Sequence, residues 1–76
     1  MILTLVVSDN CEACDRAKIV IEEIRKKHPC LIIETININQ YINRKLSITP
    51  ALLIDHKLFS YGDINQNRLL NKINKE

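Results

Sequence analysis

Cys11 and Cys14 are the residues whose type and spacing most clearly allow chemistry in this sequence. They form a Cys-Glu-Ala-Cys motif between an apolar, β-branched segment and a segment with helical periodicity. A side chain at a helix N-terminus meets unpaired backbone N–H groups and the positive end of the helix dipole, which favour an anion. A residue three positions later lies on the same helix face. Since thiolates are the nucleophiles of disulfide exchange, this spacing predicts a reactive Cys11 and a resolving Cys14.

Negative charge accompanies the first cysteine of the motif. Glu12 lies inside the motif and Asp9 lies shortly before it. A neighbouring like charge opposes formation of the Cys11 thiolate, whereas the helix N-terminus favours it, and the two effects are of similar size. Since no positive or aromatic side chain joins the motif, we expect a reducing disulfide with a potential of about −240 to −290 mV.

The segments around the motif alternate between strand and helix patterns. Residues 2–7 are almost all apolar, which is typical of a strand buried on both faces. From residue 12 to residue 27 apolar side chains recur at helical spacing, and Pro29 prevents the helix from continuing. The predicted order is β-α-β-α-β-β-α, with strands at 2–7, 31–38, 51–54 and 58–61 and helices at 12–27, 39–46 and 64–75.

Short polar segments mark the ends of these elements. Residues 55–57, Asp-His-Lys, are predicted to join the last two strands as a hairpin turn. Asn39 is the expected N-cap of the second helix. Asp63 with Gln66 forms a capping-box pattern that is predicted to open the last helix.

Length, composition and charge limit the classes of protein to consider. Seventy-six residues are expected to form one domain, 1–76. A net charge of +2 without a basic stripe, and only one Phe and two Tyr residues, argue against nucleic-acid binding. The longest apolar run is too short to span a bilayer, so we expect no membrane association. Three cysteines without a recognisable signal peptide favour a reducing, cytoplasmic location, and we expect a monomer.

Cys30 is the third cysteine, and it is predicted to open the second strand as a small buried hydrophobic residue. An alternative is a zinc site made by Cys11, Cys14, His28 and Cys30, a three-cysteine, one-histidine set. A helix over residues 12–27 would, however, hold Cys30 roughly 24 Å from the motif. We therefore expect no metal site and no cofactor.

The order of elements, the position of the Cys-x-x-Cys motif and Thr49-Pro50 before the hairpin resemble the thioredoxin fold in its small glutaredoxin-like form. The segment 49–57, Thr-Pro-Ala-Leu-Leu-Ile-Asp-His-Lys, is similar to short thioredoxin-like redox-active disulfide proteins. The resemblance implies an α/β fold with a four-stranded mixed sheet flanked by helices. It implies a protein-disulfide reductase in which Cys11 attacks and Cys14 resolves. It also implies a cis Pro50, with the Thr49 backbone free to pair with an extended substrate.

The sequence departs from the thioredoxin and glutaredoxin patterns at positions that bear on the choice of electron donor. Thioredoxins have a tryptophan before the motif and a buried carboxylate six residues before the first cysteine, where this chain has Asn10 and Leu5. Glutaredoxins bind glutathione partly through a Gly-Asp element, which Gly62-Asp63 matches only in part. We therefore expect protein disulfides as substrates and a thioredoxin-reductase type of donor rather than glutathione.

Two metal-binding alternatives use the same cysteines. Small soft-metal chaperones also have a Cys-x-x-Cys after a first strand, where two thiolates hold an ion such as Cu(I). The motif of these chaperones has the pattern Met-x-Cys-x-x-Cys, and in this chain Asp9 occupies the Met position. The second alternative is an iron–sulfur cluster shared between two chains through Cys11. The presence of Cys14 and the partial glutathione element make it the weaker of the two.

Overall fold

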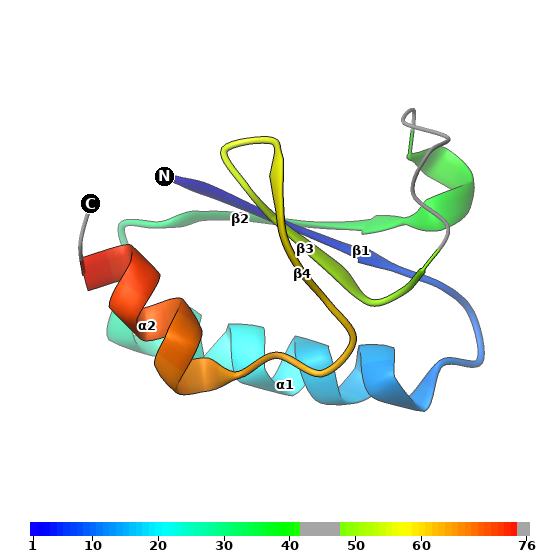
Figure 1. The fold of residues 1–76 in the computed structure, drawn as a ribbon, viewed down its shortest axis with the longest axis horizontal. Helices are drawn as coiled ribbons and strands as arrows, with labels where there is room; N and C mark the ends of the chain where they lie inside the picture. Colours follow the sequence, from blue (N-terminus) through cyan, green and yellow to red (C-terminus); the bar gives the residue numbers. More distant parts are fainter. Residues whose placement is uncertain (42–47, 75–76) are drawn as a thin grey trace.

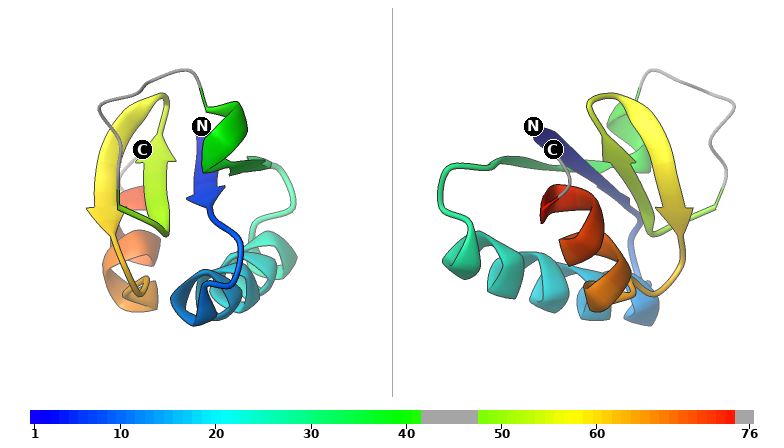
Figure 2. Two further views of the ribbon diagram at one scale, coloured as in Figure 1. Left: turned by 90° about the vertical axis from the view of Figure 1, so that its right-hand side faces the viewer. Right: turned by 60° about the vertical axis from the view of Figure 1, so that its left-hand side comes forward.

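The computed structural model describes residues 1–41 and 48–74. In this part of the chain one mixed sheet has both α-helices on the same side (Figures 1 and 2). The elements are β1 (Ile2–Val7), α1 (Glu12–Lys27), β2 (Ile32–Asn37), the 3₁₀ turn η1 (Ile38–Gln40), β3 (Ala51–Ile54), β4 (Lys57–Tyr61) and α2 (Gln66–Asn74). The predicted α/β class and four-stranded mixed sheet are confirmed.

The strands lie in the order β2-β1-β3-β4. β1 pairs in parallel with β2 and antiparallel with β3, so its residues are almost all buried, as the apolar run predicted. Val6, near the end of β1, is opposite Ala51, the first residue of β3. The segment that follows β1 and the segment that precedes β3 therefore meet at the same end of the sheet. This register brings the Cys-x-x-Cys motif next to Thr49-Pro50.

Helix α1 has the bounds that periodicity predicted. Its buried residues are Cys14, Ala17, Ile21 and Ile24, one helical face. Acidic side chains occupy the first turn and basic ones the last, which suits the helix dipole. The buried face packs with one side of β1 and with α2, in a core of Leu3, Leu5, Val7, Cys14, Ala17, Ile21, Ile24, Leu52, Ile54, Leu69 and Ile73.

A smaller apolar cluster lies on the other face of the sheet. Val6, Ala51 and Leu53 form it, with Ile36, Ile38 and Tyr41 packed against them. The helix predicted over 39–46 falls mostly on residues 42–47, which lie outside the described residues. The part that is described begins as the 3₁₀ turn η1, capped by Asn37 rather than Asn39: the Asn37 Oδ1 accepts a hydrogen bond from the Asn39 N–H at 2.9 Å.

The β3–β4 hairpin has a two-residue turn. Asp55 and His56 both have positive φ, 50° and 69°, as a type I′ turn requires. Lys57, predicted in the turn, is the first residue of β4. Asp55 also fastens the hairpin to β1, since its Oδ1 accepts a bond from the Ile2 N–H and its own N–H donates to the Ile2 carbonyl, both at 2.8 Å.

Two predictions about polar and sulfur side chains are wrong. Asp63 does not cap α2; the helix begins at Gln66 and Asn65 caps it, with Oδ1 accepting from the Arg68 N–H at 3.1 Å. Cys30 is an exposed free thiol rather than a buried residue. It lies in the turn before β2, which is at the edge of the sheet, so the connection into that strand remains open to solvent.

Candidate active site

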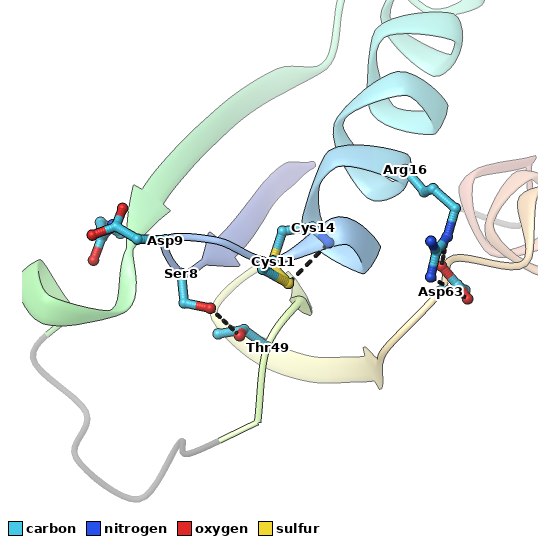
Figure 3. The surroundings of a disulfide bond; sticks show 8 residues. Ser8, Asp9, Cys11, Cys14, Arg16, Thr49 and Asp63 are labelled. Atoms are coloured by element: carbon cyan, nitrogen blue, oxygen red, sulfur yellow. Dashed lines mark hydrogen bonds and ion pairs between the residues drawn. A yellow bond between two sulfur atoms is a disulfide. The ribbon is translucent and has the colours of Figure 1, made fainter.

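The two cysteines of the motif are joined by a disulfide where β1 gives way to α1 (Figure 3). Cys11 is the N-cap residue of α1, with extended backbone angles (φ −117°, ψ 104°). Its Sγ takes the place of the oxygen that usually caps a helix, because it accepts a hydrogen bond from the Cys14 N–H at 3.0 Å. The sulfur of Cys11 thus lies against a backbone donor at the positive end of the helix.

The two sulfurs differ in their access to solvent. Cys14 is 1% exposed and belongs to the main core, whereas Cys11 is partly exposed and only borders that core. A large molecule approaching this end of the sheet therefore reaches Cys11 and not Cys14.

The Thr49–Pro50 peptide bond is cis, as the resemblance implied, and Pro50 is buried. The hydroxyl of Thr49 is hydrogen-bonded to that of Ser8 at 2.7 Å. The Pro50 carbonyl accepts a bond from the Gly62 N–H at 2.7 Å. These contacts tie the segment before β3 to the end of β1 on one side and to the end of β4 on the other. The structure thus brings together the four predicted site residues, Cys11, Cys14, Thr49 and Pro50.

Ser8 is a site neighbour that sequence reasoning missed. It lies in a polar turn, and a serine there gives no local signal of its partner 41 positions later. Only the pairing of β1 with β3 places the two hydroxyls together.

Polar side chains surround the accessible sulfur. A hollow beside Cys11 is lined by Ser8, Asp9, Asn10, Cys11, Glu12, Asp15 and Lys18. Asn10 adopts a positive φ of 54°, a conformation that asparagine tolerates better than most residues, and this turns the chain into α1. The Asp9 carboxylate accepts a bond from the Asn37 side chain at 3.2 Å, which connects the motif to the end of β2. Asp15 and Lys18 were not predicted as site residues.

Arg16 and Asp63 form an ion pair near the disulfide (Figure 3). The Arg16 Nε donates to Asp63 Oδ1 at 2.9 Å, and a second nitrogen lies 3.4 Å from Oδ2. The Asp63 carboxylate raises the pKa of Arg16, first through this hydrogen bond and then through its charge. The Asp63 carboxylate is thus directed to α1, and Asn65 rather than Asp63 caps α2.

The four residues of the zinc alternative do not come together. His28 and Cys30 follow the end of α1, whereas Cys11 and Cys14 lie at its start. Over residues 1–41 and 48–74, no three His, Cys, Asp or Glu side chains are grouped closely enough to hold a metal ion. In the same residues, no helix is long and apolar enough to cross a bilayer.

The strand order, the paired helices and the disulfide position define a thioredoxin fold. The solved structure of a malaria-parasite thioredoxin-2, described as a component of the parasite's protein secretion machinery, superimposes on 99% of this chain and 82% of its own with a TM-score of 0.78. Identity between the two sequences is 17%, so the likeness is one of fold. No protein-family model matches the sequence, and no curated protein matches it. Thioredoxin fold and Cys-x-x-Cys disulfide together support a redox role.

Proposed function

We propose that this protein is a thiol–disulfide oxidoreductase that reduces protein disulfides. The observation that carries the proposal is the disulfide between a partly exposed Cys11 and a buried Cys14 at the start of α1. Reduction of a disulfide by a dithiol uses one sulfur that the substrate can reach and a second sulfur close enough to displace the substrate from the mixed disulfide. The arrangement provides both within one helical turn.

In the proposed cycle the reduced protein attacks first. The Cys11 thiolate bonds to one substrate sulfur, the substrate S–S bond breaks, and the first substrate thiolate leaves and takes up a proton. The Cys14 sulfur then bonds to Cys11 Sγ and displaces the second substrate thiolate, to which its proton passes. The substrate gains two electrons and two protons, and the protein is left with the Cys11–Cys14 disulfide seen here.

The surroundings of Cys11 suit this chemistry. The Cys14 N–H that donates to Cys11 Sγ, and the helix N-terminus itself, favour a negative sulfur. The Thr49-Pro50 segment is held beside the motif by the Ser8 hydroxyl, and we propose that its backbone pairs with an extended substrate. The electron donor is proposed to be a flavoprotein reductase of the thioredoxin-reductase type rather than glutathione. The proposed location is a reducing compartment such as the cytoplasm.

Reduction of insulin tests the proposal directly. With dithiothreitol as electron source, the native protein should accelerate precipitation of the insulin B chain, and Cys11→Ser should abolish the acceleration. Cys14→Ser, reduced beforehand and freed of dithiothreitol, should instead accumulate mixed disulfides with insulin, visible as a mass increase that added dithiothreitol removes. Full activity in Cys11→Ser would eliminate this function. Stoichiometric copper or iron bound by the protein as isolated, without insulin reduction, would favour a metal-binding module instead.

The donor is tested separately. The oxidised protein is mixed with NADPH and a thioredoxin reductase, or with NADPH, glutathione and glutathione reductase, and NADPH consumption is followed. We expect turnover with the first system. Turnover with the second alone would contradict the proposed donor while leaving the disulfide chemistry in place.

A further inference from the structure

The surface around the accessible sulfur has the opposite charge to the whole chain. The chain carries a net charge of +2. Of the described residues that line the hollow beside Cys11, three are carboxylates, Asp9, Glu12 and Asp15, and Lys18 is the cation. Cys11 lines the same hollow, so the carboxylates flank the sulfur that a substrate disulfide must reach in the proposed function.

The three carboxylates are placed by the fold. Glu12 and Asp15 are exposed in the first turn of α1, where the helix dipole stabilises acidic side chains. Asp9 is exposed and is held by its hydrogen bond from Asn37. All three therefore lie beside Cys11 and face solvent.

The nearest arginine on α1 does not cancel this charge. Arg16 is one position beyond Asp15, but its guanidinium is paired with Asp63. The pair is neutral as a unit, and the charge of Glu12 raises the pKa of Arg16 less than Asp63 does, so the hollow keeps an excess of negative charge.

We propose that Asp9, Glu12 and Asp15 select substrates in which the disulfide is flanked by basic residues, and that they disfavour anionic disulfides such as that of glutathione. This inference rests on the proposed function, because it concerns which disulfides reach Cys11. Charges within one Debye length, about 8 Å at physiological salt, act on a docking partner with little screening. A charged cleft of this kind changes association rates about tenfold or more at low ionic strength.

The experiment compares three peptides that differ only in the residues flanking one intramolecular disulfide: lysine, serine or glutamate. Protein reduced beforehand and freed of reductant is mixed with each peptide, and single-turnover rates are measured at low and high salt. We expect the lysine peptide to react about tenfold faster than the glutamate peptide at low salt. The ratio should fall to about two at 0.5 M salt, where the Debye length is only a few ångströms.

The ratio of the two rates separates docking from reactivity. Removing a carboxylate also changes how readily Cys11 ionises, but that effect multiplies the rate with every peptide and cancels in the ratio. Glu12→Gln with Asp15→Asn should reduce the ratio at least threefold, and Glu12→Gln alone should reduce it in the same direction. The matched control is Glu23→Gln, which changes an exposed glutamate of α1 about 18 Å along the helix from Cys11. This variant should leave the ratio unchanged.

Each outcome has one meaning. Equal rates with the lysine and glutamate peptides at all salt concentrations would overturn the inference while leaving the reductase function intact. A ratio that persists when Asp9→Asn is added to the double variant would overturn it too, because the three named carboxylates would not be its source. No reaction with the serine peptide would instead refute the proposed function itself.

Discussion

The hydroxyl groups of Ser8 and Thr49 lie 2.7 Å apart and join the residue after β1 to the residue before Pro50. The bond is partly buried and spans 41 positions of the sequence. It fixes the Thr49-Pro50 segment relative to the turn that leads to Cys11. A substrate that pairs with the Thr49 backbone would therefore be aligned with the sulfur through this contact.

A double-mutant cycle measures this contact. Ser8→Ala and Thr49→Val each remove one hydroxyl, and we expect each to cost about 1 kcal/mol of unfolding free energy, with a coupling of about 0.5–1.5 kcal/mol. Both should lower insulin reduction more than they lower alkylation of Cys11 by iodoacetamide. Urea denaturation and the two rates provide the readouts. Additive stability effects would show that the two hydroxyl groups are not coupled. Equal losses in the two rates would show that the bond does not position the substrate.

The Arg16–Asp63 pair predicts an effect of charge rather than of stability. Asp63→Asn leaves Arg16 uncompensated on the second turn of α1, about 7.5 Å along the axis from Cys11. The rate with the glutamate-flanked disulfide should then rise about two- to threefold, whereas the serine-flanked peptide should be little affected. The pair is well exposed, so the free energy of unfolding should change little.

The control for this variant breaks a comparable pair at the other end of the helix. Glu22→Gln frees Arg25 from its 3.4 Å contact, and it should not change either rate. The pH dependence follows from the raised pKa of Arg16. A cationic group with a raised pKa in the folded protein contributes its full stabilisation at any pH below its ordinary pKa. That stabilisation is lost only as the pH rises through the raised pKa. The contribution of Arg16 in this pair to the free energy of unfolding should therefore be constant across neutral pH. A contribution that changes between about pH 6 and pH 8 would contradict the raised pKa of Arg16.

Cys30 is expected to be dispensable. Because it is exposed and unpaired, Cys30→Ala should change the free energy of unfolding by less than about 0.5 kcal/mol and leave insulin reduction unchanged. The folded, oxidised protein should react with one equivalent of Ellman's reagent, and the variant with none. A thiol that reacts only after denaturation, or a cost well above 1 kcal/mol, would mean that Cys30 is buried after all.

Local sequence signals predicted the elements that local interactions determine. The bounds of α1 followed from apolar spacing and from Pro29, which acts on its neighbours in the chain. The start of α2 did not follow from local signals, because Asp63 and Asn65 are both good capping residues. Asp63 is paired instead with Arg16, which is 47 positions away in sequence and gives no local signal.

The two sulfurs of the site could be predicted from the sequence, but most of the contacts around them could not. Cys11 and Cys14 are neighbours on one helix, so their spacing indicates their contact. Ser8 and Thr49 meet only through the register of two strands, which the sequence pattern does not specify. Cys30 was misjudged for a related reason, since apolar composition does not reveal that β2 lies at the edge of the sheet.

The reduction potential should reflect the opposing charges around Cys11. The helix N-terminus and the Cys14 N–H favour the thiolate of the reduced protein, which raises the potential, whereas the neighbouring carboxylates lower it. We expect a value of about −240 to −290 mV, close to that of thioredoxin. Glu12→Gln removes one opposing charge and should raise the potential by about 10–20 mV, since about 30 mV corresponds to 1.4 kcal/mol for a two-electron couple. Glu23→Gln, far along α1, should leave it unchanged. Equilibration with thiol–disulfide buffers, followed by alkylation and mass measurement, gives these values, and a potential above about −180 mV would place the protein among disulfide-forming enzymes.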